Sequence, residues 1–184
     1  MTPFLQAIES FDPVVWATLG TWVLIVATIV LLYWQTRQEH RLHSANAVLE
    51  LRERFDAPRM RSARRQLSTV LLHGSPGDVA NAEVASFFEL IGALVHGGML
   101  NERIVWNAFG SWITNYYWGL RHPNDRIGQI REKFKDPLVF FEFEWLNGRV
   151  LRLDRAMLGE EYTGLPPPEL EATALLEREA ALEG

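Results

Sequence analysis

Residues 101–121 have the sequence NERIVWNAFGSWITNYYWGLR, which predicts one long helix of an all-α fold. Asn101 is a residue type that caps helix N-termini by accepting backbone N–H bonds. His122 and Pro123 end the helical pattern, and apolar residues recur between these ends at spacings of three and four. The aromatic side chains lie on more than one face of this helix: Trp106, Phe109, Trp112, Tyr116, Tyr117 and Trp118.

This aromatic surplus predicts a surface for a protein partner, because one small bundle cannot bury every one of these rings. Trp and Tyr are preferred anchors of protein interfaces. Trp118 and Tyr117 are the stronger candidates for the interface. Core packing is the simpler explanation for Trp106, Phe109 and Trp112.

Helix signals also surround this stretch. They predict a break at Asp56 and Pro58, a helix from Asp78 to Gly97, a shorter one between Asn124 and Phe134, and a last core helix from Asp136 and Pro137. The apolar residues from Val139 to Phe143 are also compatible with a buried strand. No other segment of the sequence predicts a strand that could pair with it, so a helix is expected there.

The carboxy-terminal end differs from the rest in charge. From Ala156 onward there are seven acidic residues and one basic residue, Arg178. Three prolines, from Pro166 to Pro168, predict a stiff extended spacer. The final residues favour a free helix whose few apolar residues would contact a partner: Leu175, Leu176 and Leu182.

The amino-terminal run from Val14 to Trp34 has 21 residues and no charge. As a helix it would cover ~30 Å, the hydrocarbon thickness of a bilayer, so it predicts a transmembrane helix with lipid as its partner. A cleavable signal peptide is rejected because no Lys or Arg precedes the run. Arg37 and Arg41 follow it, which predicts an inner-membrane protein with its amino terminus outside and the remainder cytoplasmic.

These observations predict four parts. Residues 1–12 form a short extracytoplasmic segment, and residues 13–35 form the transmembrane helix. Residues 36–158 form a cytoplasmic bundle of about five helices, into which the membrane helix continues. Residues 159–184 form the proline spacer and the acidic helical tail.

Composition excludes several kinds of chemistry. The chain has no Cys, which rules out disulfides, thiolate metal sites and cysteine nucleophiles. Its net charge of -5 argues against nucleic-acid binding. It has no glycine-rich phosphate loop, no nucleophile elbow and no HExxH motif. A non-enzyme without a cofactor or metal is therefore expected.

The densest basic cluster is an alternative site, for an anion. It consists of Arg59, Arg61, Arg64 and Arg65. The simpler interpretation is a solvated helix face whose arginines pair with nearby Glu residues or with the acidic tail.

A second alternative is a metal-binding or enzymatic role for Glu39, His40 and His43. His40 and His43 are three residues apart on one predicted helix, and Glu39 is four residues before His43. Such spacings place side chains on one face. No second pair of this kind occurs in the remaining sequence. Glu89, in turn, is expected to be a structural carboxylate paired with an arginine rather than a catalytic group.

A family resemblance rests on four short motifs: Met60-Arg61-x-x-Arg64-Arg65, Phe87-Phe88-Glu89-x-x-Gly92, Gly97-Gly98 and Trp106. From Leu42 to Arg155 the chain resembles an uncharacterised bacterial family of small single-pass membrane-anchored proteins, a domain of unknown function. The resemblance implies an inner-membrane setting and a helical cytosolic domain, and it supplies no catalytic residues.

The expected function is that of a non-catalytic accessory or scaffold subunit. It would bind a protein partner, or a second copy of itself, at the cytoplasmic face of the membrane. The absence of catalytic motifs, the aromatic surplus and the spacer leading to a free helix support this expectation.

Overall fold

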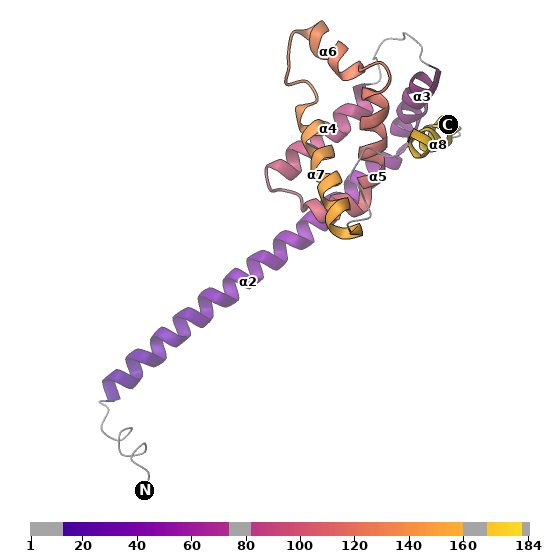
Figure 1. The fold of residues 1–184 in the computed structure, drawn as a ribbon. Coiled ribbons are helices and arrows are strands. Elements are labelled where there is room, and N and C mark those ends of the chain that lie inside the picture. The colour runs from indigo at the N-terminus through magenta and orange to yellow at the C-terminus, as the bar shows by residue number, and fades with distance from the viewer. Residues whose placement is uncertain (1–12, 74–81, 160–168, 182–184) are drawn as a thin grey trace. The chain divides into compact units, whose positions relative to one another are not determined.

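The computed structural model describes residues 13–73, 82–159 and 169–181. The described residues form helices and no strand (Figure 1), so the all-α prediction is confirmed. The helices are α2 (Pro13–Asp56), α3 (Pro58–His73), α4 (Ala82–His96), α5 (Glu102–Arg121), α6 (Arg126–Phe134), α7 (Phe141–Leu158) and α8 (Glu169–Ala180). The chain divides into two compact units, residues 1–43 and 44–184.

In the first unit, α2 carries exposed apolar side chains from Trp22 to Trp34. None of the described helices combines the length and the apolar character needed to cross a membrane. The predicted single-pass inner-membrane location, with Val14 to Trp34 as the span and a cytoplasmic domain behind it, is therefore wrong.

Local signals placed most of the helix ends correctly. The Asn101 side chain accepts the backbone N–H groups of Arg103, at 3.0 Å, and Ile104, at 3.4 Å, and so caps α5 as expected. Asp56 and Pro58 separate α2 from α3. Asp78, the expected cap of α4, lies outside the described residues.

The last core helix starts later than expected. Asp136 accepts the backbone N–H of Leu138 at 2.8 Å and holds a turn, whereas α7 begins at Phe141. Phe140 has a left-handed backbone, with φ of 58°, which interrupts helical geometry at that point. The stretch from Val139 to Phe143 contains no strand, as expected.

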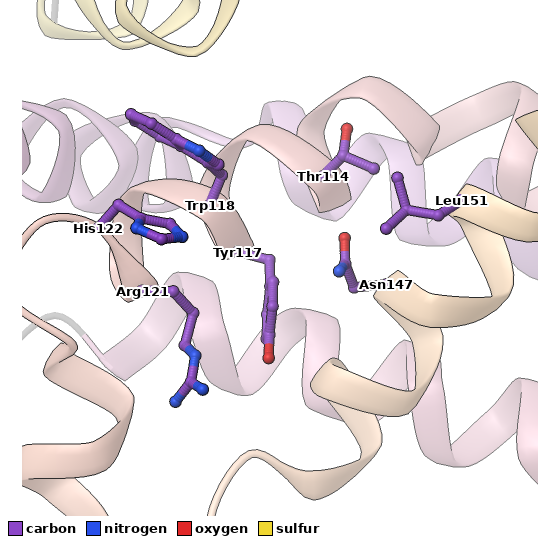
Figure 2. A pocket seen from close by; sticks show the side chains of 7 residues that line it. All are labelled: Thr114, Tyr117, Trp118, Arg121, His122, Asn147 and Leu151. Carbon is purple, nitrogen blue, oxygen red and sulfur yellow. The ribbon is translucent and has the colours of Figure 1, made fainter. Parts of the chain in front are cut away.

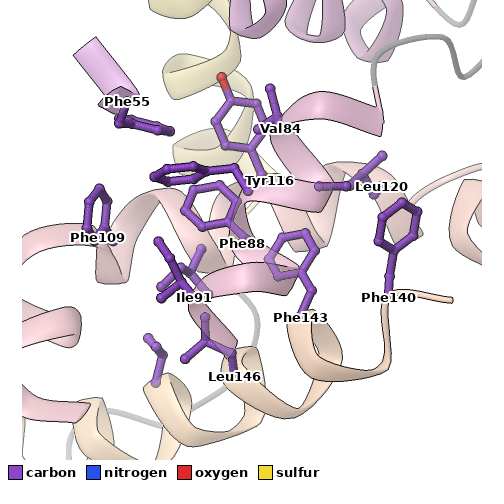
Figure 3. Packing of buried hydrophobic residues seen from close by; sticks show 14 of the residues in the cluster. Phe55, Val84, Phe88, Ile91, Phe109, Tyr116, Leu120, Phe140, Phe143 and Leu146 are labelled. Atoms are coloured by element: carbon purple, nitrogen blue, oxygen red, sulfur yellow. The ribbon is translucent and has the colours of Figure 1, made fainter. Parts of the chain in front are cut away.

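The second unit is built around packed aromatic rings (Figure 3). Phe55 contacts Phe87, Phe109 and other rings at centroid distances between 5.3 and 5.7 Å. Phe88 stacks on Phe143 at 5.2 Å and so joins α4 to α7. Rings from α2, α4, α5 and α7 thus meet in one buried cluster, which fixes these elements relative to one another.

The Phe87-Phe88-Glu89-x-x-Gly92 motif is the seam between α4 and α7. Glu89 accepts the backbone N–H of Phe143 at 2.6 Å, and the N-cap residue of α7, Phe140, makes no side-chain cap bond. A carboxylate from α4 therefore caps α7, a different role from the expected pairing with an arginine. A Cβ at Gly92 would overlap the carbonyl of Glu142, so glycine lets the two helices approach closely.

Candidate functional site

Helix α8 does not lie free; it packs on α3 and α5. Ala172, Leu175 and Leu176 are buried in this contact. The expectation that Leu175 and Leu176 belong to a free, partner-seeking tail is therefore corrected: both are covered by their own domain. Leu182 lies outside the described residues. The α8-binding face, as we call it, is made by Arg64, Ser68 and Leu71 of α3 with Trp112, Tyr116 and Gly119 of α5.

The apolar part of this face depends on Gly119. A Cβ at this position would lie 3.1 Å from Leu71 Cδ1 and 3.4 Å from Leu176 Cδ1. These distances are at or below the lower limit of ordinary van der Waals contact. The missing side chain therefore allows Leu176 of α8 to settle between α3 and α5.

The polar part of the α8-binding face surrounds the buried carboxylate of Glu179. The Tyr116 hydroxyl donates to Oε2 at 3.1 Å, and Trp112 Nε1 donates to Oε1 at 3.5 Å. The hydroxyls of Ser68 and Tyr116 are 3.3 Å apart and extend the network into α3. Burial and the nearby Glu179 charge raise the pKa of Tyr116 well above its usual value, so this hydroxyl stays protonated and can donate.

Arg64 supplies the positive charge opposite Glu179. Its Nε lies 3.0 Å from Glu179 Oε2, its Nη1 lies 3.8 Å from Asp56 Oδ1, and its side chain is only 4% exposed. The guanidinium also lies over the Phe55 ring, 4.1 Å from the centroid. A buried charge without a partner is costly, so Arg64 and Glu179 each require the other.

The basic cluster therefore does not form one free face. Arg64 pairs with Glu179 of the acidic tail, as the simpler interpretation expected, but it is buried rather than on a solvated face. Arg59 pairs with Glu83 at 2.8 Å, and Arg61 Nε donates to the Asp56 carbonyl at 2.8 Å. Arg65 is half-buried and also has an interaction partner.

Tyr117 and Trp118, the predicted interface residues, are half-buried and line a pocket between α5 and α7 (Figure 2). This α5–α7 pocket has a volume of about 210 Å³. Its lining combines rings, one aliphatic residue and polar groups: Thr114, Tyr117, Trp118, Arg121, His122, Asn147 and Leu151. The two candidates are thus brought together, on a concave site.

Tyr117 is tied to Glu144 of α7. Burial and the hydrogen bond to the Glu144 carboxylate raise the pKa of Tyr117 to about 12. Burial acts to raise the pKa of Glu144, but bonds from Arg131, at 2.7 Å, and from Tyr117 outweigh it and lower that pKa below its ordinary value. The Tyr117 hydroxyl is therefore neutral and committed to this bond at neutral pH.

The predicted metal ligands are not assembled into a described site. His43 is exposed, while the side chains of Glu39 and His40 lie outside the described part of the chain. Among the described residues, no group of three or more His, Asp or Glu side chains is placed to hold a metal ion.

Comparison with known protein families identifies a match. The family model for a domain of unknown function, DUF4760, matches residues 17–150. The chain belongs to the DUF4760 family. The expected membership of an uncharacterised family is confirmed, and the DUF4760 match covers more of the amino-terminal run than the predicted resemblance did. No curated protein and no solved structure matches the chain.

The DUF4760 match ends before α8, which begins at Glu169. The α8-binding face on α3 and α5 therefore lies within the family domain, while the helix that covers it lies beyond the match. Sequence reasoning missed Glu179, because one acidic residue does not stand out in an acidic tail. Its position three and four residues after Leu176 and Leu175 was the available signal, since this spacing places all three on one helix face.

Proposed function

We propose that this chain is a non-catalytic interaction subunit that uses its α8-binding face to hold an amphipathic helix of a protein partner. One observation carries the proposal: a face of the family domain is covered by a helix from outside the family-matched residues. In this chain α8 acts as the resident ligand of that face, and a partner helix takes its place.

The chemistry of the face defines the helix that it accepts. Leu175 and Leu176 supply apolar contacts, and Glu179 supplies a carboxylate to the buried Arg64. Arg64 selects for an acidic residue because an apolar or basic residue there would leave its buried charge with only the more distant and exposed Asp56 carboxylate, at 3.8 Å. The partner helix is therefore expected to carry two adjacent leucine-like residues followed, three or four positions later, by Glu or Asp.

Covalent attachment of α8 regulates access to the face. A tethered helix acts at an effective concentration of order mM. A partner helix must therefore bind more tightly than α8, or bind when α8 has been displaced. This competition gives the subunit a closed form, with α8 in place, and an open form that holds its partner.

In the test, α8 stays attached while the chain folds and is freed afterwards by cutting the chain. A specific protease site is placed within residues 160–168, the folded chain is cut, and a labelled peptide of residues 169–184 is added. Exchange of the peptide onto the cut protein, measured by fluorescence anisotropy, supports the proposal. A Glu179→Gln peptide is expected to bind at least tenfold more weakly.

The matched control is Arg61→Met, on the exposed side of the same helix as Arg64. Arg64→Met should abolish the preference for the unmodified peptide over the Glu179→Gln peptide, while Arg61→Met should leave that preference intact. Failure of the peptide to exchange, or equal binding of both peptides to the unmodified face, contradicts the proposal. A dimer that forms by exchanging α8 between two copies would identify a second copy as the partner.

A further inference from the structure

The α5–α7 pocket contains a buried polar side chain that the fold does not use. Asn147 of α7 is only 9% exposed and lines the pocket. Its amide makes no hydrogen bond to any group in the described ranges, and because its polar atoms are not among the fully enclosed ones, the amide is accessible from the pocket. In Figure 2 it lies across from Tyr117, with Thr114 and Leu151 nearby.

Three other polar side chains of the pocket, Thr114, Tyr117 and Arg121, already have partners. Thr114 Oγ1 donates to the carbonyl of Gly110 at 3.1 Å, within its own helix. Arg121 Nη1 donates to Asp125 Oδ1 at 2.7 Å, and the Tyr117 hydroxyl is bonded to Glu144. His122 is exposed at the rim, where its ring lies 5.4 Å from that of Trp118. Among the buried side chains of the lining, Asn147 is therefore the polar one left to recognise a ligand.

The lining of the α5–α7 pocket favours an uncharged ligand. The charge of Arg121 is compensated by Asp125, so the described lining of the pocket offers no uncompensated guanidinium that would favour an anion. An amide side chain offers one acceptor and two donors side by side. Its best complement is a neutral group that also presents a donor next to an acceptor, because two parallel hydrogen bonds then form.

The volume of the pocket and the residue types of its walls limit further which ligands can bind. A volume of about 210 Å³ corresponds to about seven water molecules, room for one substituted ring. Trp118, Tyr117 and Leu151 provide aromatic and aliphatic walls, and pockets of this kind typically combine apolar walls with few polar groups. We infer that the α5–α7 pocket binds a small planar ligand bearing a primary carboxamide or lactam, which pairs with the amide of Asn147.

The experiment titrates the full chain with two probes of nearly the same shape. Benzamide has an acceptor and a donor, while acetophenone keeps the carbonyl acceptor and replaces the NH₂ donor by a methyl group. Binding is measured by calorimetry and by the NMR shift of the Asn147 side-chain NH₂. Benzamide is expected to bind about tenfold more tightly than acetophenone, in line with the loss of one buried hydrogen bond.

Two variants of the chain test the inference independently of the comparison between probes. Asn147→Leu should weaken benzamide binding about tenfold and leave acetophenone binding nearly unchanged. Asn107→Leu, an exposed position on α5 outside the pocket lining, is the matched control and should bind both probes as the unmodified chain does. If Asn147→Leu does not fold, the comparison of the two probes on the unmodified chain still decides.

Three results overturn the inference. They are equal affinity for benzamide and acetophenone, benzamide binding unaffected by Asn147→Leu, and no binding of either probe. In the last case the pocket holds only water.

Discussion

Arg64 Nε of α3 lies 3.0 Å from Glu179 Oε2 of α8, and both side chains are buried. This ion pair joins a residue of the family domain to a helix beyond the family match. It makes the position of α8 sensitive to charge, because neither group can be left alone in the core at low cost.

Arg64→Met is expected to lower the free energy of unfolding by about 3 kcal/mol, since it leaves the buried Glu179 carboxylate without its cation. Tyr116 and Trp112 still donate to Glu179, which keeps the loss from being larger. The double change Arg64→Met with Glu179→Leu should recover most of the stability. Denaturant titration of the parent chain and both variants measures these changes, and a single variant as stable as the parent would show that the pair is not needed.

Glu89→Ala is expected to destabilise the chain by about 1–2 kcal/mol, because it removes the cap from the first turn of α7. Denaturant titration should show this loss in the free energy of unfolding, and hydrogen exchange at the Phe143 amide should become faster. Glu53→Ala, an exposed change near the end of α2, is the control and should stay within about 0.5 kcal/mol of the parent. Unchanged exchange at Phe143 would contradict the capping role.

We expect two Gly-to-Ala substitutions to change the free energy of unfolding in opposite directions: Gly92→Ala should lower it and Gly148→Ala should raise it. The added Cβ at Gly92 meets the Glu142 carbonyl and should cost about 1–3 kcal/mol through strain at the α4–α7 contact. At Gly148, inside α7, no atom lies within 4 Å of an added Cβ, so the higher helix propensity of Ala should stabilise by about 0.5–1 kcal/mol. Thermal unfolding with the same result for both variants would refute the close approach at Gly92.

Alkaline pH is expected to destabilise the fold through Tyr117. Its pKa is about 10 in an unfolded chain and is raised to about 12 in the fold. A raised tyrosine pKa means that the folded state holds the proton more tightly, so its contribution is complete below pH ~10 and is lost as pH rises toward about 12. Tyr117→Phe should flatten the decline in unfolding free energy across this window. An unchanged slope would contradict the assignment.

Helix positions were largely predictable because their signals are local. The cap at Asn101 and the break at Asp56 and Pro58 depend on residues within one turn of each other. The start of α7 was not predictable to the residue, since Glu89, which caps it, lies 54 residues from Phe143. A cap supplied by another helix leaves no local mark in the sequence.

The candidate sites were predictable only in part. Tyr117 and Trp118 stood out by residue type, and the structure places both in one pocket. Asn147 did not stand out, because an Asn on a helix is ordinary until packing buries it and leaves its amide unpaired. The role of the tail was misjudged for a related reason: the apolar residues of α8 are too few to reveal whether another element covers them.

The sequence alone established the all-α class, most helix limits and the acidic character of the carboxy-terminal end. These features depend on helix propensity, capping and proline, which act over three or four residues. Packing between distant helices settled the rest. The pairing of Arg64 with Glu179, across 115 positions of sequence, depends on how α3, α5 and α8 fit together. The same packing leaves Asn147 facing a pocket with an unpaired amide. Side-chain partners far apart in the chain are selected by burial and shape, and neither is encoded in a short window.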